Sequence, residues 1–295
     1  MELPVFKIRA SAASEILAGK IGLTDAQSAK LKDLNDRHNG IGLPLTDKMK
    51  IERDGLLYKQ ANPELPTGAK TYCEKWLKEK LYERRKNFAN QYLEKGIACE
   101  DASISYAAEH LGWGLVEKNE EWFSDDWMEG TPDIVTTLWS RQVAPNNEVL
   151  EFEDPTVIDM KNVWDCFTMP LFEDEIPTEG YATQLKVYMH LVSKGYGIEF
   201  NNAILCYALM SAPLNVMEKQ MRSLSWEEGQ QGFITDEIRQ RVHREMSYDD
   251  FGPELRLKTF EVKSDPALIE ELIRRVEMCR LYIPTLLKKR RFLKG

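Results

Sequence analysis

The chain has 295 residues, of which 43% are hydrophobic and 29% are charged, and its formal net charge at pH 7 is −9. This balance is typical of a folded globular protein, while the acidic charge argues against a protein that coats nucleic acid by bulk electrostatics. No stretch approaches the roughly 18 apolar residues of a membrane span, and no signal peptide is recognisable, so we expect a cytoplasmic protein.

The cysteines are scattered along the chain without any CxxC pair, which argues against both a zinc site and a disulfide framework. We therefore expect buried free thiols. The five positions are Cys73, Cys99, Cys166, Cys206 and Cys279.

The first third of the chain is predicted to be mainly helical. Ser11 is a candidate N-cap for the first helix, Gly96 is expected to separate two later helices, and a segment rich in glycine and proline is expected to be an irregular loop. In order, the expected elements are a strand at 4–10, helices at 11–19, 25–38, 67–94 and 97–111, and the loop at 40–68.

From Glu121 onward the apolar pattern changes to a period of two, which is typical of strands. Expected strands lie at 122–123, 130–138, 149–163, 202–210 and 255–262, with a turn at 144–147 and a loop at 168–180. Expected helices lie at 181–193, 214–224 and 226–246, and a last one begins near 264–266. These elements predict an α/β protein with a central mixed sheet flanked by helices and a helical N-terminal region.

We expect a single domain over residues 1–295. It would consist of a helical N-terminal region at 1–95, a core at 96–212, and C-terminal helices with one strand at 213–295.

The chemically interesting residues lie on the expected strand at 149–163. Alternate residues of a strand share a face, so Val157, Asp159 and Lys161 point one way while Ile158 and Met160 point the other. The apolar pair can anchor the strand in the core while the carboxylate and the ammonium face a cleft.

Asp133 follows Gly130 and Pro132, where a strand is expected to begin in a bend. If the strands at 133–138 and 157–163 pair, Asp133 and Asp159 can bind one hard cation, because Mg²⁺ needs only a few protein oxygens and keeps several waters. A water near Lys161 could then attack a phosphodiester while the metal offsets the developing negative charge.

A second triplet of the same type weakens any argument from residue identity alone. Glu261-Val262-Lys263 also lies on an expected strand, but no Pro-Asp pair precedes it at a useful distance and no glutamine helix follows it. An isolated Asp-x-Lys triplet is most often an exposed edge pair. The ordered conjunction of Asp133, the 159–161 triplet and the helix that carries Gln184 is what favours a site.

Three motifs follow one another along the chain: Gly130-Thr131-Pro132-Asp133, then Asp159-Met160-Lys161, then Gln184 followed by Tyr188. Together they resemble the RecB-like branch of the PD-(D/E)xK nuclease superfamily. More narrowly, the chain resembles phage recombination exonucleases related to lambda exonuclease and the YqaJ family. The resemblance covers roughly residues 8 to 210.

Two further motifs support the resemblance. Gly96 followed by Glu100 fits the upstream glutamate of the family, with Glu109 as the rival position. The run that ends in Arg9-Ala10-Ser11 resembles the family's N-terminal serine motif, which helps hold the DNA end, with Ser14 as an alternative register.

The resemblance implies a set of roles for the matched residues. Asp133, Asp159 and the Met160 carbonyl would bind the metal, Glu100 would complete the site, and Lys161 would position or activate the attacking water. Gln184 would orient the lysine, the nucleophile or DNA. Arg9, Ser11 and Tyr188 would contact DNA. For Tyr188 core packing is the alternative, and for Ser11 it is a simple helix cap.

The function implied is a Mg²⁺-dependent DNA exonuclease that acts on linear duplex ends in phage or prophage recombination, in the host cytoplasm, with Mn²⁺ able to substitute. A single-strand annealing protein and a second copy of the chain are the partners implied. No iron–sulfur cluster is expected, because only Cys279 lies in the C-terminal region. A restriction-type or structure-specific endonuclease, or a catalytically idle DNA-binding protein, remain alternatives.

Overall fold

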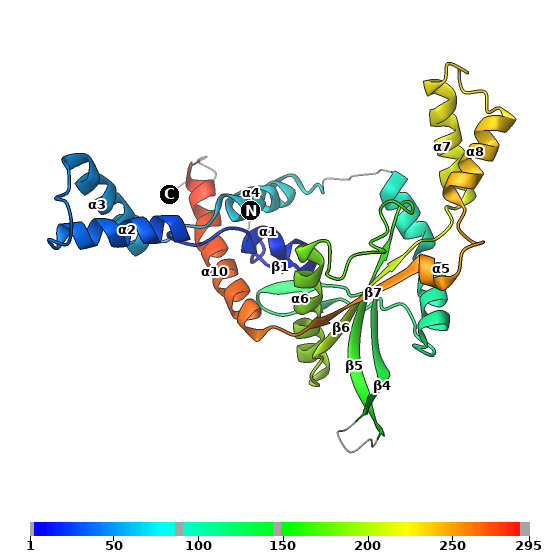
Figure 1. The fold of residues 1–295 in the computed structure, drawn as a ribbon, viewed down its shortest axis with the longest axis horizontal. Helices are drawn as coiled ribbons and strands as arrows, with labels where there is room; N and C mark the ends of the chain where they lie inside the picture. The colour runs from blue at the N-terminus through cyan, green and yellow to red at the C-terminus, as the bar shows by residue number, and fades with distance from the viewer. Residues whose placement is uncertain (1–2, 86–90, 144–148, 290–295) are drawn as a thin grey trace. The chain divides into compact units, whose positions relative to one another are not determined.

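The computed structural model describes residues 3–85, 91–143 and 149–289, and the expected turn at 144–147 lies outside these ranges. The chain divides into two compact units (Figure 1). One contains the segment up to Ile8, Ala12–Arg85 and the chain from Glu270 onward, and the other contains Arg9–Ser11 and Lys86–Ile269. These boundaries differ from those expected at 95 and 212, and a single nuclease domain stays a prediction.

The first unit is helical. Its core contains Phe6, whose ring meets Trp76 edge-on at a centroid distance of 5.2 Å. Arg275 donates hydrogen bonds to the carbonyls of Ile16 and Leu17 at 2.8 and 2.7 Å, which satisfies the end of the first helix. Its helices are α1 (Ala13–Leu17), α2 (Asp25–His38), α3 (Asp47–Ala61), α4 (Thr67–Tyr82) and most of α10 (Pro266–Lys289).

Two expectations for the N-terminal region are wrong. The supposed loop at 40–68 contains helix α3, whose N-terminus is capped by the Thr46 hydroxyl, an acceptor for the Met49 amide at 3.3 Å. No residue of α3 is buried, so it carries no apolar stripe from which the helix could have been recognised. Ser11 is not an N-cap, because it lies in a short 3-10 turn and Ala12 precedes α1 without a side-chain cap.

The long helix expected at 67–94 ends earlier. Helix α4 stops at Tyr82, and Glu83 adopts a left-handed conformation with φ of 50°. The next helix, α5 (Gln91–Leu111), runs through Gly96 without interruption, so Gly96 does not separate two helices. An added Cβ at Gly96 would meet nothing within 4 Å, and a helix interior accepts glycine at modest cost.

The second unit is built on a four-stranded mixed sheet, as expected. Its strands are β4 (Ile134–Val143), β5 (Val149–Asn162), β6 (Asn202–Ala208) and β7 (Leu257–Lys263), in the order β4-β5-β6-β7. β5 pairs antiparallel with β4 and parallel with β6, and β6 pairs antiparallel with β7. β5 therefore occupies an interior position, with backbone partners on both sides.

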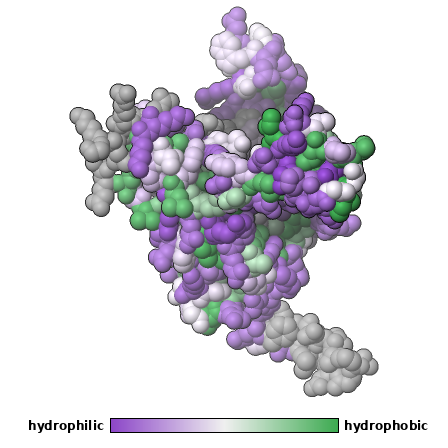
Figure 2. All heavy atoms as spheres, turned by 90° about the vertical axis from the view of Figure 1, so that its left-hand side faces the viewer, coloured by the Kyte–Doolittle hydropathy of each residue, from purple (hydrophilic) through white to green (hydrophobic). Residues whose placement is uncertain are grey.

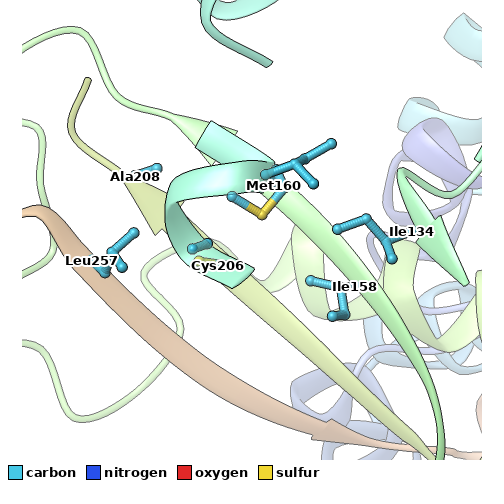
Figure 3. Packing of buried hydrophobic residues seen from close by; sticks show 8 residues of the cluster. Ile134, Ile158, Met160, Cys206, Ala208 and Leu257 are labelled. Carbon is cyan, nitrogen blue, oxygen red and sulfur yellow. The ribbon is translucent and has the colours of Figure 1, made fainter. Parts of the chain in front are cut away.

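Alternation along β5 gives the sheet two different faces. Ile158 and Met160 join Ile134, Cys206 and Leu257 in an apolar cluster that also includes Ile104 and Ala107 of α5 (Figure 3). The other face meets helix α6 (Glu179–Tyr196). The expectation that Ile158 and Met160 anchor β5 in the core is confirmed.

The remaining elements of the chain differ in detail from expectation. The strand at 4–10 is only β1 (Ile8–Arg9), and the helix expected from 226 begins ten residues later, at Asp236. β2 (Phe123–Ser124) pairs antiparallel with β3 (Met128–Gly130). The remaining helices are α7 (Leu214–Glu227), α8 (Asp236–Met246) and α9 (Pro253–Arg256).

On the face drawn in Figure 2, hydrophilic residues predominate and hydrophobic ones lie between them in small groups. Among the described residues, no helix combines the length and apolarity that crossing a bilayer requires. The five cysteines are free thiols, as expected, and all but Cys166 are buried.

Candidate active site

The site begins with the two ionic residues of β5. Asp159 is 1% exposed, and its carboxylate Oδ2 lies 2.5 Å from Lys161 Nζ. They point to the α6 side of the sheet because they alternate with Ile158 and Met160. Burial acts to lower the pKa of Lys161, but the charge and hydrogen bond of Asp159, together with Asp133 and Tyr181, raise that pKa overall. The lysine is therefore held as an ammonium.

Asp133 is brought to the same place by the bend between β3 and β4. Its Oδ2 accepts a hydrogen bond from the Met160 backbone N–H at 2.8 Å. Because Ile134 pairs with Ile158, Asp133 lies beside Asp159 at the start of the β4–β5 ladder. Burial and the Asp159 charge raise the pKa of Asp133 to about 7, and burial also raises the pKa of Asp159. Two carboxylates crowded in this way favour a bound cation.

Helix α6 supplies the amide and the phenol. Gln184 Nε2 donates to Asp159 Oδ1 at 3.3 Å and to Tyr188 Oη at 2.9 Å. The Tyr188 ring packs on Gly130, where an added Cβ would lie 2.7 Å from Tyr188 Cε1. A glycine is needed at this position because the ring and the backbone approach so closely. The four-residue spacing of Gln184 and Tyr188 thus brings both to one face of the helix, as expected.

Helix α5, which packs on the face of the sheet opposite α6, contributes Glu100. Glu100 Oε2 lies 2.8 Å from Lys118 Nζ, and Glu100 lines the same cavity as the two aspartates. The rival Glu109 is exposed and is not among the cavity's lining residues. Sequence reasoning missed Lys118, which lies in a loop without any periodic signal.

A cavity of about 640 Å³ collects these groups. Its lining includes Glu100, Asp133, Asp159, Met160, Lys161 and Gln184. Arg9, Ser11 and Tyr188 are not among the lining residues. Tyr188 is 6% exposed, which favours the packing alternative over direct DNA contact. The DNA-binding roles of all three stay predictions.

Sequence reasoning also missed Lys95, which is fully buried. Its Nζ donates to the carbonyls of Val163 and Trp164 at 3.0 and 2.7 Å, just beyond the end of β5. Burial lowers the pKa of Lys95 to about 8. Lys95 lies four residues before Cys99 and so shares the buried face of helix α5. This spacing was the signal in the sequence that could have indicated its burial.

The donor set suits a hard divalent cation. Asp159 Oδ2 is buried and, apart from its ion pair with Lys161, has no hydrogen-bond partner of normal geometry. In the described part of the chain, no three His, Cys, Asp or Glu side chains are gathered closely enough to form a metal site by themselves. Glu100 is paired with Lys118, whereas Asp133 and Asp159 lie beside each other and share Lys161 as a counter-charge, so the two aspartates are the part of the site that fits a cation.

Comparison with known proteins finds no matching family model and no matching curated sequence. Among solved structures, a phage-related exonuclease from Haemophilus somnus 129PT aligns over 97% of both chains, with 18% identity and a TM-score of 0.62. The alkaline exonuclease LHK-Exo from Laribacter hongkongensis aligns over 97% of this chain and 91% of its own, with 9% identity and a TM-score of 0.51. The chain therefore has the fold of these exonucleases, and the expected fold class is confirmed.

Proposed function

We propose that this chain is a Mg²⁺-dependent deoxyribonuclease that degrades linear double-stranded DNA from its ends, in phage or prophage recombination. One observation carries the proposal. Residues from a bend, an interior strand and a helix meet in one cavity. They are Asp133 in the bend, Asp159 and Lys161 on the strand, and Gln184 on the helix. They meet within a fold shared with exonucleases.

Asp133 and Asp159 would hold the metal, together with the Met160 carbonyl and with Glu100 directly or through water. When bound, Mg²⁺ would polarise the scissile phosphate and offset its growing negative charge. The Met160 N–H holds Asp133 in place, and Gln184 holds Asp159, so both carboxylates are oriented before substrate arrives. Lys161, as an ammonium, would position the attacking water by hydrogen bonding.

The decisive experiment compares linear duplex DNA with covalently closed circular DNA, each with Mg²⁺ or with EDTA. We expect loss of the linear substrate only, and only with Mg²⁺, with Mn²⁺ able to replace it. Cleavage of the closed circle would favour the endonuclease alternative. Absence of cleavage on both, together with retained DNA binding, would favour the idle DNA-binding alternative.

Recognition of the DNA end by Arg9 and Ser11 is a separate part of the proposal. Arginine offers a forked set of donors that matches a terminal phosphate. The helix after Ser11 has only five residues, so the backbone of α1 adds little to such a site. We expect faster degradation of 5′-phosphorylated duplex than of the 5′-hydroxyl form, and loss of that preference in Arg9→Ala. Equal wild-type rates on the two substrates would contradict this role.

The assembly in which the enzyme works is also proposed, on the strength of the resemblance alone. A single-strand annealing protein would receive the strand left by degradation, and copies of the chain would associate around the duplex. Light scattering with and without DNA would measure the association.

A further inference from the structure

Two phenylalanines in the segment between β5 and α6 are almost fully in solvent. Phe167 and Phe172 are each 91% exposed. They differ in one respect, because Phe167 lines the cavity that contains Asp133, Asp159 and Lys161, whereas Phe172 does not. Single exposed apolar side chains are common on protein surfaces, so the exposure of Phe172 needs no explanation, whereas Phe167 is set apart by its place in the lining of this cavity.

The backbone turn that carries Phe167 is stabilised by hydrogen bonds. Asp165 Oδ1 accepts hydrogen bonds from the amides of Phe167 and Thr168 at 3.1 and 2.9 Å. The Thr168 hydroxyl donates to the Asp165 carbonyl at 2.9 Å, and Met169, the next residue, is buried. The turn is thus anchored at both sides while the Phe167 ring itself has no partner in the core. Its exposure follows from the turn and not from a loose segment.

Other aromatic rings line the same cavity. Tyr92 of α5 is largely exposed and meets Trp164 edge-on, with ring centroids 4.8 Å apart. Both rings line the cavity together with Phe167. The same cavity is lined by the carboxylates and Lys161, so one opening presents both charged groups and aromatic rings.

We infer that Phe167, with Tyr92 and Trp164, forms a stacking site for a nucleobase of the strand being cleaved, next to the nucleotide whose phosphate lies at Asp133 and Asp159. The inference rests on the proposed function. A nucleotide joins a flat aromatic base to a charged phosphate, and this cavity offers a matching surface to each part. Stacking tolerates every base because all four have a π face, which suits an enzyme that must remove each nucleotide in turn.

A binding experiment tests the site without requiring cleavage. A single-stranded oligonucleotide with a terminal 2-aminopurine is mixed with the protein in Ca²⁺ in place of Mg²⁺, and fluorescence is followed. We expect wild type to quench the probe. Phe167→Ala should lose the quenching and bind about 5- to 100-fold more weakly. Phe172→Ala is the matched control, equal in exposure and in the same segment, and should behave as wild type.

Two further variants separate stacking from general apolar contact. Phe167→Trp should retain the quenching, and Phe167→Leu should lose it. Thermal unfolding should be unchanged in every variant, because the ring is in solvent. An abasic site in place of the terminal base should remove the difference in affinity between wild type and Phe167→Ala.

The outcomes distinguish the two proposals. Equal quenching by Phe167→Ala and wild type, or no quenching by wild type, would overturn the stacking site. Quenching that depends on Phe167 in a protein that cleaves no DNA would support the stacking site and reject the exonuclease. If Phe167→Ala binds DNA normally but loses contact with a protein partner, the stacking site is also overturned.

Discussion

Two acid-x-lysine triplets lie on the same four-stranded sheet and have entirely different surroundings. In β5, Asp159 is buried and its Oδ2 lies 2.5 Å from Lys161 Nζ. In β7, the Lys263 and Glu261 side chains are 70% and 82% exposed, and their charged atoms are 4.0 Å apart. The residue types are nearly the same, so the difference comes from position in the sheet.

The pairing register explains the contrast. Asp159 is opposite Leu205, and Leu205 is opposite Phe260, so these three share the face on which α6 packs. Glu261 is opposite Ile204, in the row of Ile158, and therefore points to the other face. A shift of one residue along a strand reverses the side-chain direction. β7 is also the last strand in the order, whereas β5 has partners on both sides.

The largest effect is expected on catalysis, which should be lost when the β5 triplet is changed and kept when the β7 triplet is changed. Lys161→Ala and Asp133→Asn should each lower DNA cleavage by on the order of 10³-fold, about 4 kcal/mol of transition-state stabilisation, with the fold retained by circular dichroism. Lys263→Ala should cleave at the wild-type rate. Activity lost in Lys263→Ala and kept in Lys161→Ala would reverse the assignment.

A second test concerns Lys95, which ties the end of β5 to α5. Since the folded-state pKa of Lys95 is lowered to about 8, the folded protein binds this proton more weakly than the unfolded chain does. Relative to Lys95→Met, wild type should therefore gain about 3 kcal/mol of stability as pH rises from 8 to about 10.5.

Denaturant unfolding of both proteins across this pH range measures the gain. Lys263→Met, at an exposed lysine, is the control and should change stability by less than about 0.5 kcal/mol at any one pH. A difference between wild type and Lys95→Met that stays constant with pH would contradict the burial of a charged Lys95.

Metal affinity provides the third test. Asp159→Ala should weaken Mn²⁺ binding at least about tenfold in calorimetry, because a carboxylate that would contact the metal is lost. Glu261→Ala is the matched change in the exposed triplet and should bind Mn²⁺ as wild type does. Within α5, Glu100→Gln should affect cleavage more than affinity, and Glu109→Gln should affect neither. Equal affinities of Asp159→Ala and wild type would show that the aspartate is not a ligand.

The last test concerns Gly130, which lies against Tyr188, the hydrogen-bond partner of Gln184. Gly130→Ala would push a Cβ against Tyr188, costing about 1–3 kcal/mol of stability. A displaced Tyr188 would disturb its hydrogen bond with Gln184, and with it the contact between Gln184 and Asp159. Gly96→Ala, in the interior of α5 with open space around it, should instead raise stability by about 0.5–1 kcal/mol. Thermal unfolding measures the change in stability of both variants, and their cleavage rates show whether the site is disturbed. A neutral Gly130→Ala would mean that Tyr188 moves aside freely.

Local patterns in the sequence were sufficient for several features. The helix over 25–38 was predicted with the bounds that the structure has, since Asn39-Gly40 follows its end, and the structure adds a capping box of Thr24 and Gln27 at its start. The alternation in β5 separated Ile158 and Met160 from Asp159 and Lys161, and the spacing of Gln184 and Tyr188 placed both on one face of α6. Each of these depends only on the geometry of a single element.

Other features depended on contacts between residues far apart in the chain. Helix α3 buries no residue and so left no pattern, and Gly96 is tolerated inside α5 although its residue type suggests a break. The choice of Glu100 over Glu109, the ion pair of Glu100 with Lys118, and the burial of Lys95 beneath the end of β5 each required the packed structure.

The sequence by itself therefore determined the fold class and which residues of β5 and of α6 share a face, because strand and helix periods are local. Which of two similar triplets is buried beside Asp133 was decided by sheet order and pairing register, and these exist only once β4, β5 and β6 have come together.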